Sequence, residues 1–350
     1  MSKLLAQGGY GCIFKPGMYC SGKLRSRDYV SKLSVYDDSA KNELLMSFKI
    51  KKIKHYKKYF VPVQSFCHVE KSILDHNKDI NKCDIYKKKR ENKFVLMKLE
   101  YLNSTDISSF FLQYQEKIGN NIFIYISVYK KLLFQIKKLQ SVNIVHYDLR
   151  PNNILMSNKT FNPYIIDFGI SLNMKKILNI MYNHKKKIKT HLIDVGQFYR
   201  FAPYNCYWCF DIHIINYIIH SYEGLDNKFT YEYEKESFKQ FVYENSAFHY
   251  LSDKYKALYW DNCIKYLDSL CTLTNYEVLL HLIKNYKRWD ITGLSMTFLQ
   301  LVGYNKQLQN SDIFKQFVMT LFSNVSFDSN NISSIDKNIY NLNKLKIKQD

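Results

Sequence analysis

Two aspartates and an asparagine near the middle of the chain have side chains and a spacing that suit metal-assisted phosphoryl transfer. Asp148 lies five residues before Asn153, and an apolar Ile-Leu pair follows the asparagine. A second aspartate, Asp167, comes directly after the apolar run 164–166. A carboxylate can orient an attacking hydroxyl and take its proton, and carboxylate and amide oxygens are ligands that Mg²⁺ prefers. The three residues therefore supply the acidic groups and metal ligands that such a transfer needs.

Small residues near the N-terminus suit a hairpin that brings backbone amides close to phosphate groups. Ala6, Gly8 and Gly11 fill a G-x-G-x-x-G frame with alanine in the first place, and the apolar Ile13 follows. Glycine serves there because a side chain would obstruct the approach of a phosphate. A dinucleotide-binding fold is less favoured, because no long strand precedes this segment and no helix follows it. The residues expected to contact a nucleotide are Ala6, Gln7, Gly8, Gly9, Tyr10, Gly11 and Ile13.

A lysine lies inside an apolar stretch that is typical of a strand. Lys32 belongs to the run 29–33, and an inward-facing ammonium there is costly unless it meets a phosphate or a carboxylate. The segment 41–48 has a helical pattern and contains Glu43, which is the natural partner of the lysine. Taken singly, each of the two residues fits an exposed surface position equally well. Together with the motifs on either side, they indicate an ion pair that fixes the position of the lysine.

The order of these motifs along the chain resembles that of the protein kinase family. His146, Tyr147 and Asp148 are similar to the H-R-D catalytic loop, Asn153 to the asparagine of that loop, and residues 167–169 to the D-F-G motif. The N-terminal small residues and the strand lysine also stand in the family's order. The resemblance extends over most of the chain and is strongest in its first 170 residues.

The resemblance implies an ATP- and Mg²⁺-dependent protein kinase whose substrate is a protein hydroxyl. On this basis Asp148 takes the proton of the hydroxyl, and Asn153 and Asp167 hold the Mg²⁺ ions that bridge the phosphates of ATP. Lys32 grips the phosphates of ATP, and Glu43 orients the lysine.

Two residues of the catalytic loop depart from the commonest family pattern. Arg150 stands where serine/threonine kinases usually carry lysine, and its charge would still neutralise the transferred phosphate. The Arg-Pro-Asn-Asn run is more similar to the serine/threonine pattern, so Ser and Thr are the expected acceptors. Tyr147 stands where many regulated kinases have the arginine that binds a phosphorylated activation loop. It predicts an enzyme that is active without phosphorylation of residues 170–210.

Beyond the D-F-G motif the resemblance loosens. Residues 200–203 are similar to the A-P-E signature, with tyrosine in place of the glutamate that should follow, and Asp211 offers an acidic group a little later. The segment 288–301 is similar to the buried D-x-W-S-x-G helix, whose aspartate braces the catalytic loop. We therefore expect Asp290 rather than Asp211 in the bracing role, with residues 212–289 as a large helical insertion. The late arginine that usually pairs with the A-P-E glutamate is not recognisable in the tail.

The pattern of the expected elements changes near residue 102. Before it, short apolar runs alternate with loops and are typical of strands; after it, segments of helical periodicity dominate, among them 122–139. We therefore expect an α+β, two-lobed kinase-like fold with a small β-rich lobe over 1–101 and a large helical lobe over 102–350. The basic stretch between Cys67 and Lys93 is interpreted as a surface insertion between two strands. The expected strands are 12–14, 29–33, 60–63 and 94–99.

The composition is that of a folded protein, with 46% hydrophobic and 16% aromatic residues among 350. There is no charged leader before an apolar segment and no run of about 18 apolar residues, so a soluble, intracellular protein without membrane contact is expected. The eight cysteines are too sparse for a disulfide framework and fit a reducing compartment. The net charge of +20 permits nucleic-acid binding, but the Lys- and Asn-rich composition typical of an AT-rich genome explains the charge better.

The run 8–16, together with Val-Ser-Lys-Leu at 30–33, resembles the divergent kinases of large nucleocytoplasmic DNA viruses, which implies the host cytoplasm or the virion as location. Three alternatives stay open. A small-molecule kinase of the aminoglycoside or choline type also uses H-x-D-x-x-x-x-N, but it usually lacks this glycine hairpin and a D-F-G motif. A pseudokinase scaffold usually lacks a metal ligand or the catalytic base, and neither is missing here. A basic nucleic-acid-binding protein with an incidental kinase fold would bind tightly, with a steep dependence on salt.

Overall fold

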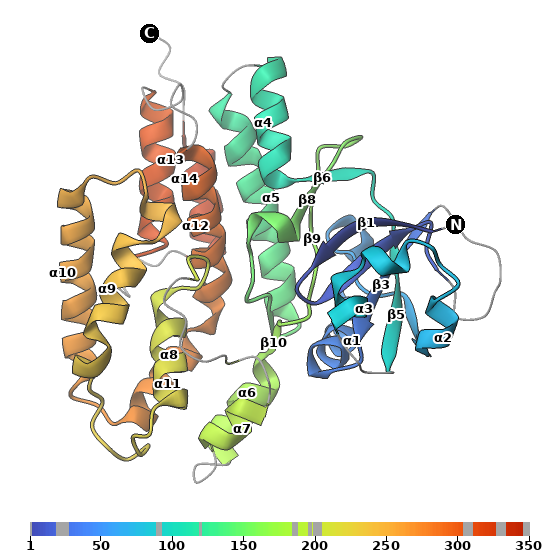
Figure 1. Cartoon of the computed structure of the whole chain (residues 1–350). Helices are drawn as coiled ribbons and strands as arrows, with labels where there is room; N and C mark the ends of the chain where they lie inside the picture. The colour runs from blue at the N-terminus through green and yellow to red at the C-terminus, as the bar shows by residue number, and fades with distance from the viewer. Residues whose placement is uncertain are drawn as a thin grey trace. The chain divides into compact units, whose positions relative to one another are not determined.

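The computed structural model describes residues 2–18, 28–88, 93–118, 121–183, 188–194, 198, 205–303, 311–326 and 334–345. The chain divides into two compact units. The sheet unit comprises Met1–Thr105 and Leu155–Ser171, and the helical unit comprises Asp106–Ile154 and Leu172–Asp350. The expected α+β class is confirmed, because a five-stranded antiparallel sheet forms the sheet unit and helices dominate the helical unit (Figure 1).

The expected division placed all residues after 101 in the helical lobe, but the segment 155–171 belongs to the sheet unit. Ile165 forms a parallel bridge with Phe60, and its backbone N–H donates to the carbonyl of Tyr59 at 3.0 Å. Tyr164 and Ile166 pack against apolar side chains of the sheet. These contacts attach the segment that contains Asp167 to the sheet, although the sequence places it far from the strands.

The strands of the main sheet are β1 (Lys3–Gly8), β2 (Gly11–Lys15), β3 (Tyr29–Val35), β4 (Ser65–Val69) and β5 (Phe94–Glu100). Their order is β1-β2-β3-β5-β4, and every neighbouring pair is antiparallel. Three of the four expected strands match β2, β3 and β5. The expected strand over 60–63 is wrong, because Pro62 offers no backbone N–H to a ladder and β4 begins only at Ser65.

One face of the sheet is covered by α1 (Asp38–Ile50). Asp37 is the N-cap of this helix, and its carboxylate accepts a hydrogen bond from the backbone N–H of Ala40 at 3.0 Å. Ala40 and Leu44 pack against apolar side chains of β3 and β5. This packing directs the intervening Glu43 into the interior, where only 4% of the residue is exposed.

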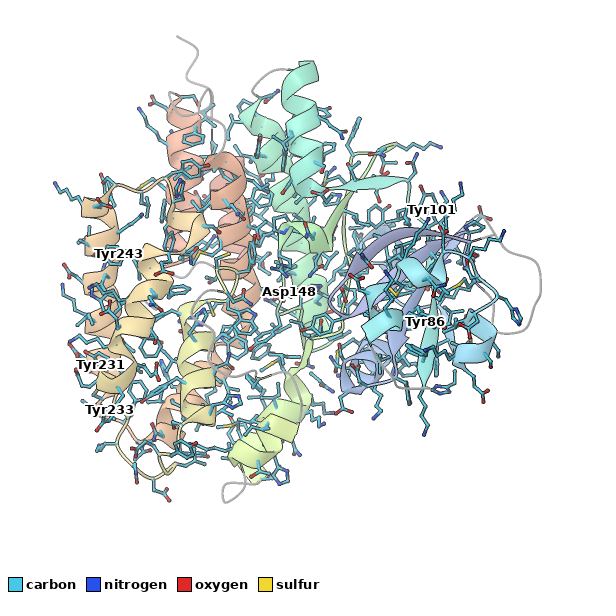
Figure 2. All side chains as sticks on the ribbon, viewed as in Figure 1. Tyr86, Tyr101, Asp148, Tyr231, Tyr233 and Tyr243 are labelled. Atoms are coloured by element: carbon cyan, nitrogen blue, oxygen red, sulfur yellow. A yellow bond between two sulfur atoms is a disulfide. The ribbon has the colours of Figure 1, made fainter. Side chains whose placement is uncertain are left out.

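The insertion between β4 and β5 covers the other face of the sheet and is more than a surface loop. It contains α2 (Lys71–Leu74), the 3₁₀ turn η2 (Ile80–Lys82) and α3 (Asp84–Lys88). Tyr86, labelled in Figure 2, is buried beside the sheet and donates a hydrogen bond to Asp75.

A disulfide between Cys12 and Cys83 joins β2 to this insertion. Cys67 is also disulfide-bonded. The expectation of reduced cysteines is therefore wrong for these residues. The packing of the insertion on the sheet brings the Cα atoms of Cys12 and Cys83 to 5.9 Å, a separation that a disulfide spans, although 71 positions part them in the sequence.

The helical unit is built around α5 (Ile122–Ser141) and α12 (Trp289–Gly303), which pack against each other (Figure 1). The helical prediction for 122–139 is confirmed, and the segment 212–289 is mostly helical as expected. None of the described helices is long and apolar enough to cross a membrane. The other helices are α4 (Ile107–Ile118), α6 (Met174–Asn183), α7 (Ile188–Asp194), α8 (Phe210–His220), α9 (Lys235–Tyr243), α10 (Asp253–Leu270), α11 (Asn275–Lys284), α13 (Asp312–Ser323) and α14 (Ile335–Asn343).

Short elements complete the fold. A three-stranded sheet has the order β6-β8-β9, from Ser104–Asp106, Ile154–Ser157 and Pro163–Ile165. A two-stranded sheet pairs β7 (Ile144–Val145) with β10 (Leu172–Asn173) in the helical unit. Directly after β7 come residues 146–153, called the catalytic-loop segment for their similarity to the H-R-D motif. The 3₁₀ turns besides η2 are η1 (Tyr56–Lys58), η3 (Pro151–Asn153), η5 (Glu232–Glu234), η6 (Ser246–Phe248) and η7 (Tyr286–Arg288).

Candidate active site

The β1-β2 hairpin contains all the residues expected to contact a nucleotide. Ala6 lies opposite Ile13, Gly8 lies opposite Gly11, and Gly9 and Tyr10 form the turn between the strands. A Cβ atom on Gly11 would lie 2.9 Å from Cε of Lys32. The missing side chain at this glycine therefore leaves room for the lysine, a role that the G-x-G-x-x-G frame alone does not reveal.

Lys32 lies between two carboxylates inside the sheet unit. Its Nζ is 2.8 Å from Oε2 of Glu43 and 3.0 Å from Oδ1 of Asp167. Burial by itself would lower the pKa of Lys32, but the charges of Glu43 and Asp167 outweigh it and hold the pKa above its usual value. Burial raises the pKa of Glu43, and the nearby ammonium opposes that shift. The predicted Lys32–Glu43 ion pair is confirmed, and the lysine is fully charged at neutral pH.

The segment that contains Asp167 is held by α1 through a contact that the sequence did not reveal. The side-chain amide of Asn42 donates hydrogen bonds to the carbonyls of Gly169 and Ser171, each at 2.9 Å. Ser39 Oγ donates to the same carbonyl of Gly169 at 3.4 Å. Asp167 itself has φ of 61°, a left-handed conformation that few non-glycine residues adopt. Asn42 and Glu43 are consecutive on the helix, so α1 positions both the lysine and the Asp167 segment.

In the helical unit, Asp148 and Asn153 are joined across one turn of the catalytic-loop segment. Nδ2 of Asn153 donates to the carbonyl of Asp148 at 2.9 Å and to its carboxylate at 2.8 Å. Arg150 Nε lies 3.8 Å from the same carboxylate, and its side chain is 48% exposed. Asp148, labelled in Figure 2, is thereby fixed in orientation, with a cation beside it that a phosphate could also meet.

Asp290, at the start of α12, braces the catalytic-loop segment as predicted. Its carboxylate accepts hydrogen bonds from the backbone N–H of His146 at 2.7 Å and of Tyr147 at 3.0 Å. Burial raises the pKa of Asp290, although the nearby imidazole and the two backbone N–H groups oppose the shift. Thr297 adds a hydrogen bond from the same helix to the carbonyl of Leu149. A single buried helix therefore holds the backbone on both sides of Asp148.

Asp211 has a different role, because it forms a buried ion pair with Arg288. Nε of the arginine lies 2.9 Å from Oδ2 of the aspartate, and a terminal guanidinium nitrogen lies 2.5 Å from Oδ1. The Asp211 side chain is fully buried and that of Arg288 is 11% exposed. The sequence offered no arginine in the tail as partner of an acidic group in this region; the partner of Asp211 is Arg288, which directly precedes α12. Residues 200–204, with the A-P-E-like signature, lie outside the described residues.

Replacing Arg288 with methionine is expected to lower the free energy of unfolding by about 3–5 kcal/mol, because the buried carboxylate of Asp211 would lose its opposite charge and, among the described residues, keep only a hydrogen bond from the Tyr266 hydroxyl at 3.3 Å. Denaturant unfolding measures the change. The matched control is Lys137→Met, which removes an ion pair with Asp336 whose side chains are 50% and 72% exposed. That control should cost no more than about 1 kcal/mol. Equal effects of the two substitutions would contradict a structural role for the buried pair.

The candidate metal ligands agree in chemistry with Mg²⁺. Asp167 and Asn153 offer carboxylate and amide oxygens, and the hydrogen bonds of Asn153 use its nitrogen and leave its oxygen for a cation. No group of three or more His, Cys, Asp or Glu side chains that could hold a metal occurs in the part of the chain that the structure describes. Mg²⁺ in nucleotide sites needs only one or two protein carboxylates, because phosphates and water supply the remaining ligands.

The predicted site residues fall into two sets. Lys32, Glu43 and Asp167 meet in the sheet unit, and Asp148, Arg150 and Asn153 meet in the helical unit. No family model matches the chain, and none of the curated proteins matches it. What supports a function is therefore the geometry within each of the two sets.

Proposed function

We propose that the protein is an ATP- and Mg²⁺-dependent protein kinase of two-lobed fold that phosphorylates serine and threonine hydroxyls. The observation that carries the proposal is the buried Lys32 ammonium, held at 2.8 and 3.0 Å by Glu43 and Asp167 and lying directly beside Gly11 of the hairpin. A buried lysine with two carboxylates and a glycine backbone next to it suits the binding of nucleotide phosphates. The Asp148–Asn153 pair braced by Asp290 supplies the group that acts on the acceptor.

The proposed roles follow from the chemistry of each side chain. Asp148 orients the acceptor hydroxyl and takes its proton as the hydroxyl oxygen bonds to the γ-phosphorus, and the bond to the β-γ bridging oxygen breaks to leave ADP. Asn153 fixes the Asp148 carboxylate, and Arg150 neutralises charge on the transferred group. Asp167 and Asn153 would hold Mg²⁺, which would neutralise charge on the phosphates. Lys32, oriented by Glu43, holds the phosphates for attack.

The resemblance of the hairpin and strand motifs also supports a place among the divergent kinases of large nucleocytoplasmic DNA viruses. An intracellular location, in the host cytoplasm or the virion, belongs to that proposal.

The test of the function is to incubate the purified protein with γ-labelled ATP, Mg²⁺ and a panel of protein acceptors, with choline and aminoglycosides in parallel. The expected result is that the labelled phosphate is transferred to protein and that hydrolysis of the labelled protein yields phosphoserine or phosphothreonine. Label only in a small molecule would overturn the protein-kinase assignment, and no label in any acceptor would favour a scaffold.

We expect the enzyme to be active as synthesised, without phosphorylation of residues 170–210. Tyr147 is buried with its ring against Phe198 and Trp208, at centroid distances of 6.2 and 5.0 Å, so this position offers no cation to a phosphate. Lys189 also donates hydrogen bonds to two backbone carbonyls of the segment 221–223.

The measurement is an initial rate after phosphatase treatment, with mass spectrometry to confirm that the segment carries no phosphate and with the phosphatase removed. An unchanged initial rate is the expected result. A rate that starts near zero and recovers only as Thr190 becomes phosphorylated would contradict the prediction. Ser171 is fully buried and is not expected to react, and Tyr199 lies outside the described residues.

A further inference from the structure

A cavity of about 560 Å³ opens beside the catalytic-loop segment, entirely within the helical unit. Its lining comes from the loop residues Arg150 to Asn152, from α4 and α5, from Tyr207, and from Gln300 and Leu301 of α12. Arg150 reaches from this cavity to within 3.8 Å of the Asp148 carboxylate. A chain that presents a hydroxyl to Asp148 therefore has its neighbouring side chains within reach of the cavity, because successive residues of an extended chain advance by only about 3.3 Å.

Apolar and aromatic side chains form part of the cavity lining, beside the polar side chains of Ser108, Asn152 and Gln300. Phe111 and Tyr125 stack with ring centroids 3.9 Å apart and an interplanar angle of 5°, and both residues are almost fully buried. Leu301 extends this surface, and Leu112 lies at the mouth with 59% of its surface exposed. An apolar side chain that enters such a cavity leaves water for an apolar surface and gains affinity.

The charged group among the described residues that line the cavity is a cation, whose own carboxylate neighbour, that of Asp148, lies 3.8 Å from it and outside the lining. Among these described residues, Arg150 is the charged one, and none carries a carboxylate. The guanidinium lies over the ring of Tyr207 at 5.5 Å, and the Tyr207 hydroxyl donates to Gln300 at 2.8 Å, so neither group offers a counter-ion to an incoming cation. A lysine or arginine side chain would lose hydration there and meet a like charge.

We propose that this cavity binds an apolar side chain of the protein substrate within a few residues of the phosphorylated hydroxyl and rejects lysine and arginine at that position. The proposal rests on the proposed kinase function and adds a substrate class to it. Acceptor sites flanked by large apolar residues are the substrates that fit, in spite of the many basic residues of the chain itself.

The first test uses serine peptides in which each of the three positions before and after the serine is Leu, Ala, Lys or Glu in turn. At one or two positions, kcat/KM should follow the order Leu above Ala above Lys. The gain of Leu over Ala should be on the order of tenfold, the discrimination that a hydrophobic pocket gives for a few carbon atoms. Equal rates for Leu and Lys at every position would overturn the proposal.

The second test places a carboxylate at the mouth of the cavity. Leu112→Glu should reduce the preference for Leu over Lys by about two- to fivefold, the effect of a partly exposed ion pair. The matched control is Leu258→Glu on α10, because Leu258 is 57% exposed and does not line the cavity. The control should leave the preference unchanged, and equal behaviour of the two variants would contradict the assignment of the cavity.

Measurements of peptide binding test the cavity proposal separately from the proposed kinase function. Fluorescent peptides with alanine in place of the acceptor serine are titrated against the protein, and anisotropy reports their affinity. In one outcome no peptide is phosphorylated, but Leu peptides still bind more tightly than Lys peptides and Leu112→Glu reduces this difference in affinity. The cavity assignment then holds while the kinase proposal fails. If peptides are phosphorylated without any such order in binding or rate, the cavity assignment fails while the kinase proposal holds.

Discussion

Asp167→Asn is expected to lower phosphotransfer by on the order of a thousandfold or more while the protein stays folded. An asparagine keeps the shape of the side chain but replaces a charged carboxylate by a neutral amide, which holds Mg²⁺ far more weakly. It also removes one of the two negative charges that face the Lys32 ammonium at 3.0 Å. Both losses affect the nucleotide side of the reaction directly.

The matched control is Asp38→Asn at the start of α1, where the aspartate side chain is 82% exposed and pairs with Lys41. Phosphotransfer and denaturant unfolding are measured for both variants in parallel. The control should retain its activity, and Asp167→Asn should unfold at nearly the denaturant concentration of the unsubstituted protein. Substantial Mg²⁺-dependent activity in Asp167→Asn would overturn the assignment of this residue as a metal ligand.

Under the proposed function, Lys32→Met is expected to lower kcat by at least about a hundredfold, because the phosphates of ATP would lose the cation that holds them in line. Glu43→Gln should have a smaller effect, about tenfold, because the lysine keeps Asp167 as a partner but loses its buried orienting charge. Rates at saturating ATP, together with KM for ATP, check the order of the two effects. A Glu43→Gln variant that is more impaired than Lys32→Met would contradict this account.

The free energy of unfolding of the Lys32→Met variant is expected to depend on pH. Without the ammonium, the buried carboxyl of Glu43, whose pKa burial already raises, is favoured in its protonated form in the folded protein. The folded state then binds more protons than the unfolded state, so the free energy of unfolding should fall as pH rises above the ordinary glutamate pKa of about 4.3. The double variant Lys32→Met, Glu43→Gln lacks the titrating carboxyl and should lose this dependence. A slope that persists in the double variant would assign the titration to another group.

Motifs of short sequence span could be predicted from the sequence because the spacing along the chain already determines their geometry. Asp148 and Asn153 meet across a single turn of the loop. The pairing of Lys32 with Glu43 followed from the strand 29–33, the helical pattern of 41–48 and the resemblance of the flanking motifs to the protein kinase family. Asp290 was identified because the segment 288–301 is similar to the family's D-x-W-S-x-G helix.

The contacts that were missed join residues far apart in the sequence whose types carry no local signal. Asn42 is one of many asparagines in the chain, and only the folded position of α1 shows that its amide meets the carbonyls of Gly169 and Ser171. Arg288 was not recognised as the partner of Asp211, because nothing in the sequence fixes which of many basic residues faces a buried acid. Likewise the disulfide Cys12–Cys83 depends on how the insertion packs on the sheet.

The adjacency of Asn42 and Glu43 on α1 has a consequence for inhibitor design. A compound that binds by pushing this helix away from the sheet must break the Lys32–Glu43 ion pair and also the hydrogen bonds from Asn42 and Ser39 to the Asp167 segment. Each broken interaction that leaves a buried polar group unsatisfied subtracts roughly 1–3 kcal/mol from the affinity of the compound. Compounds that leave the helix in place are therefore expected to be the tighter ligands, and a screen against this protein should favour them.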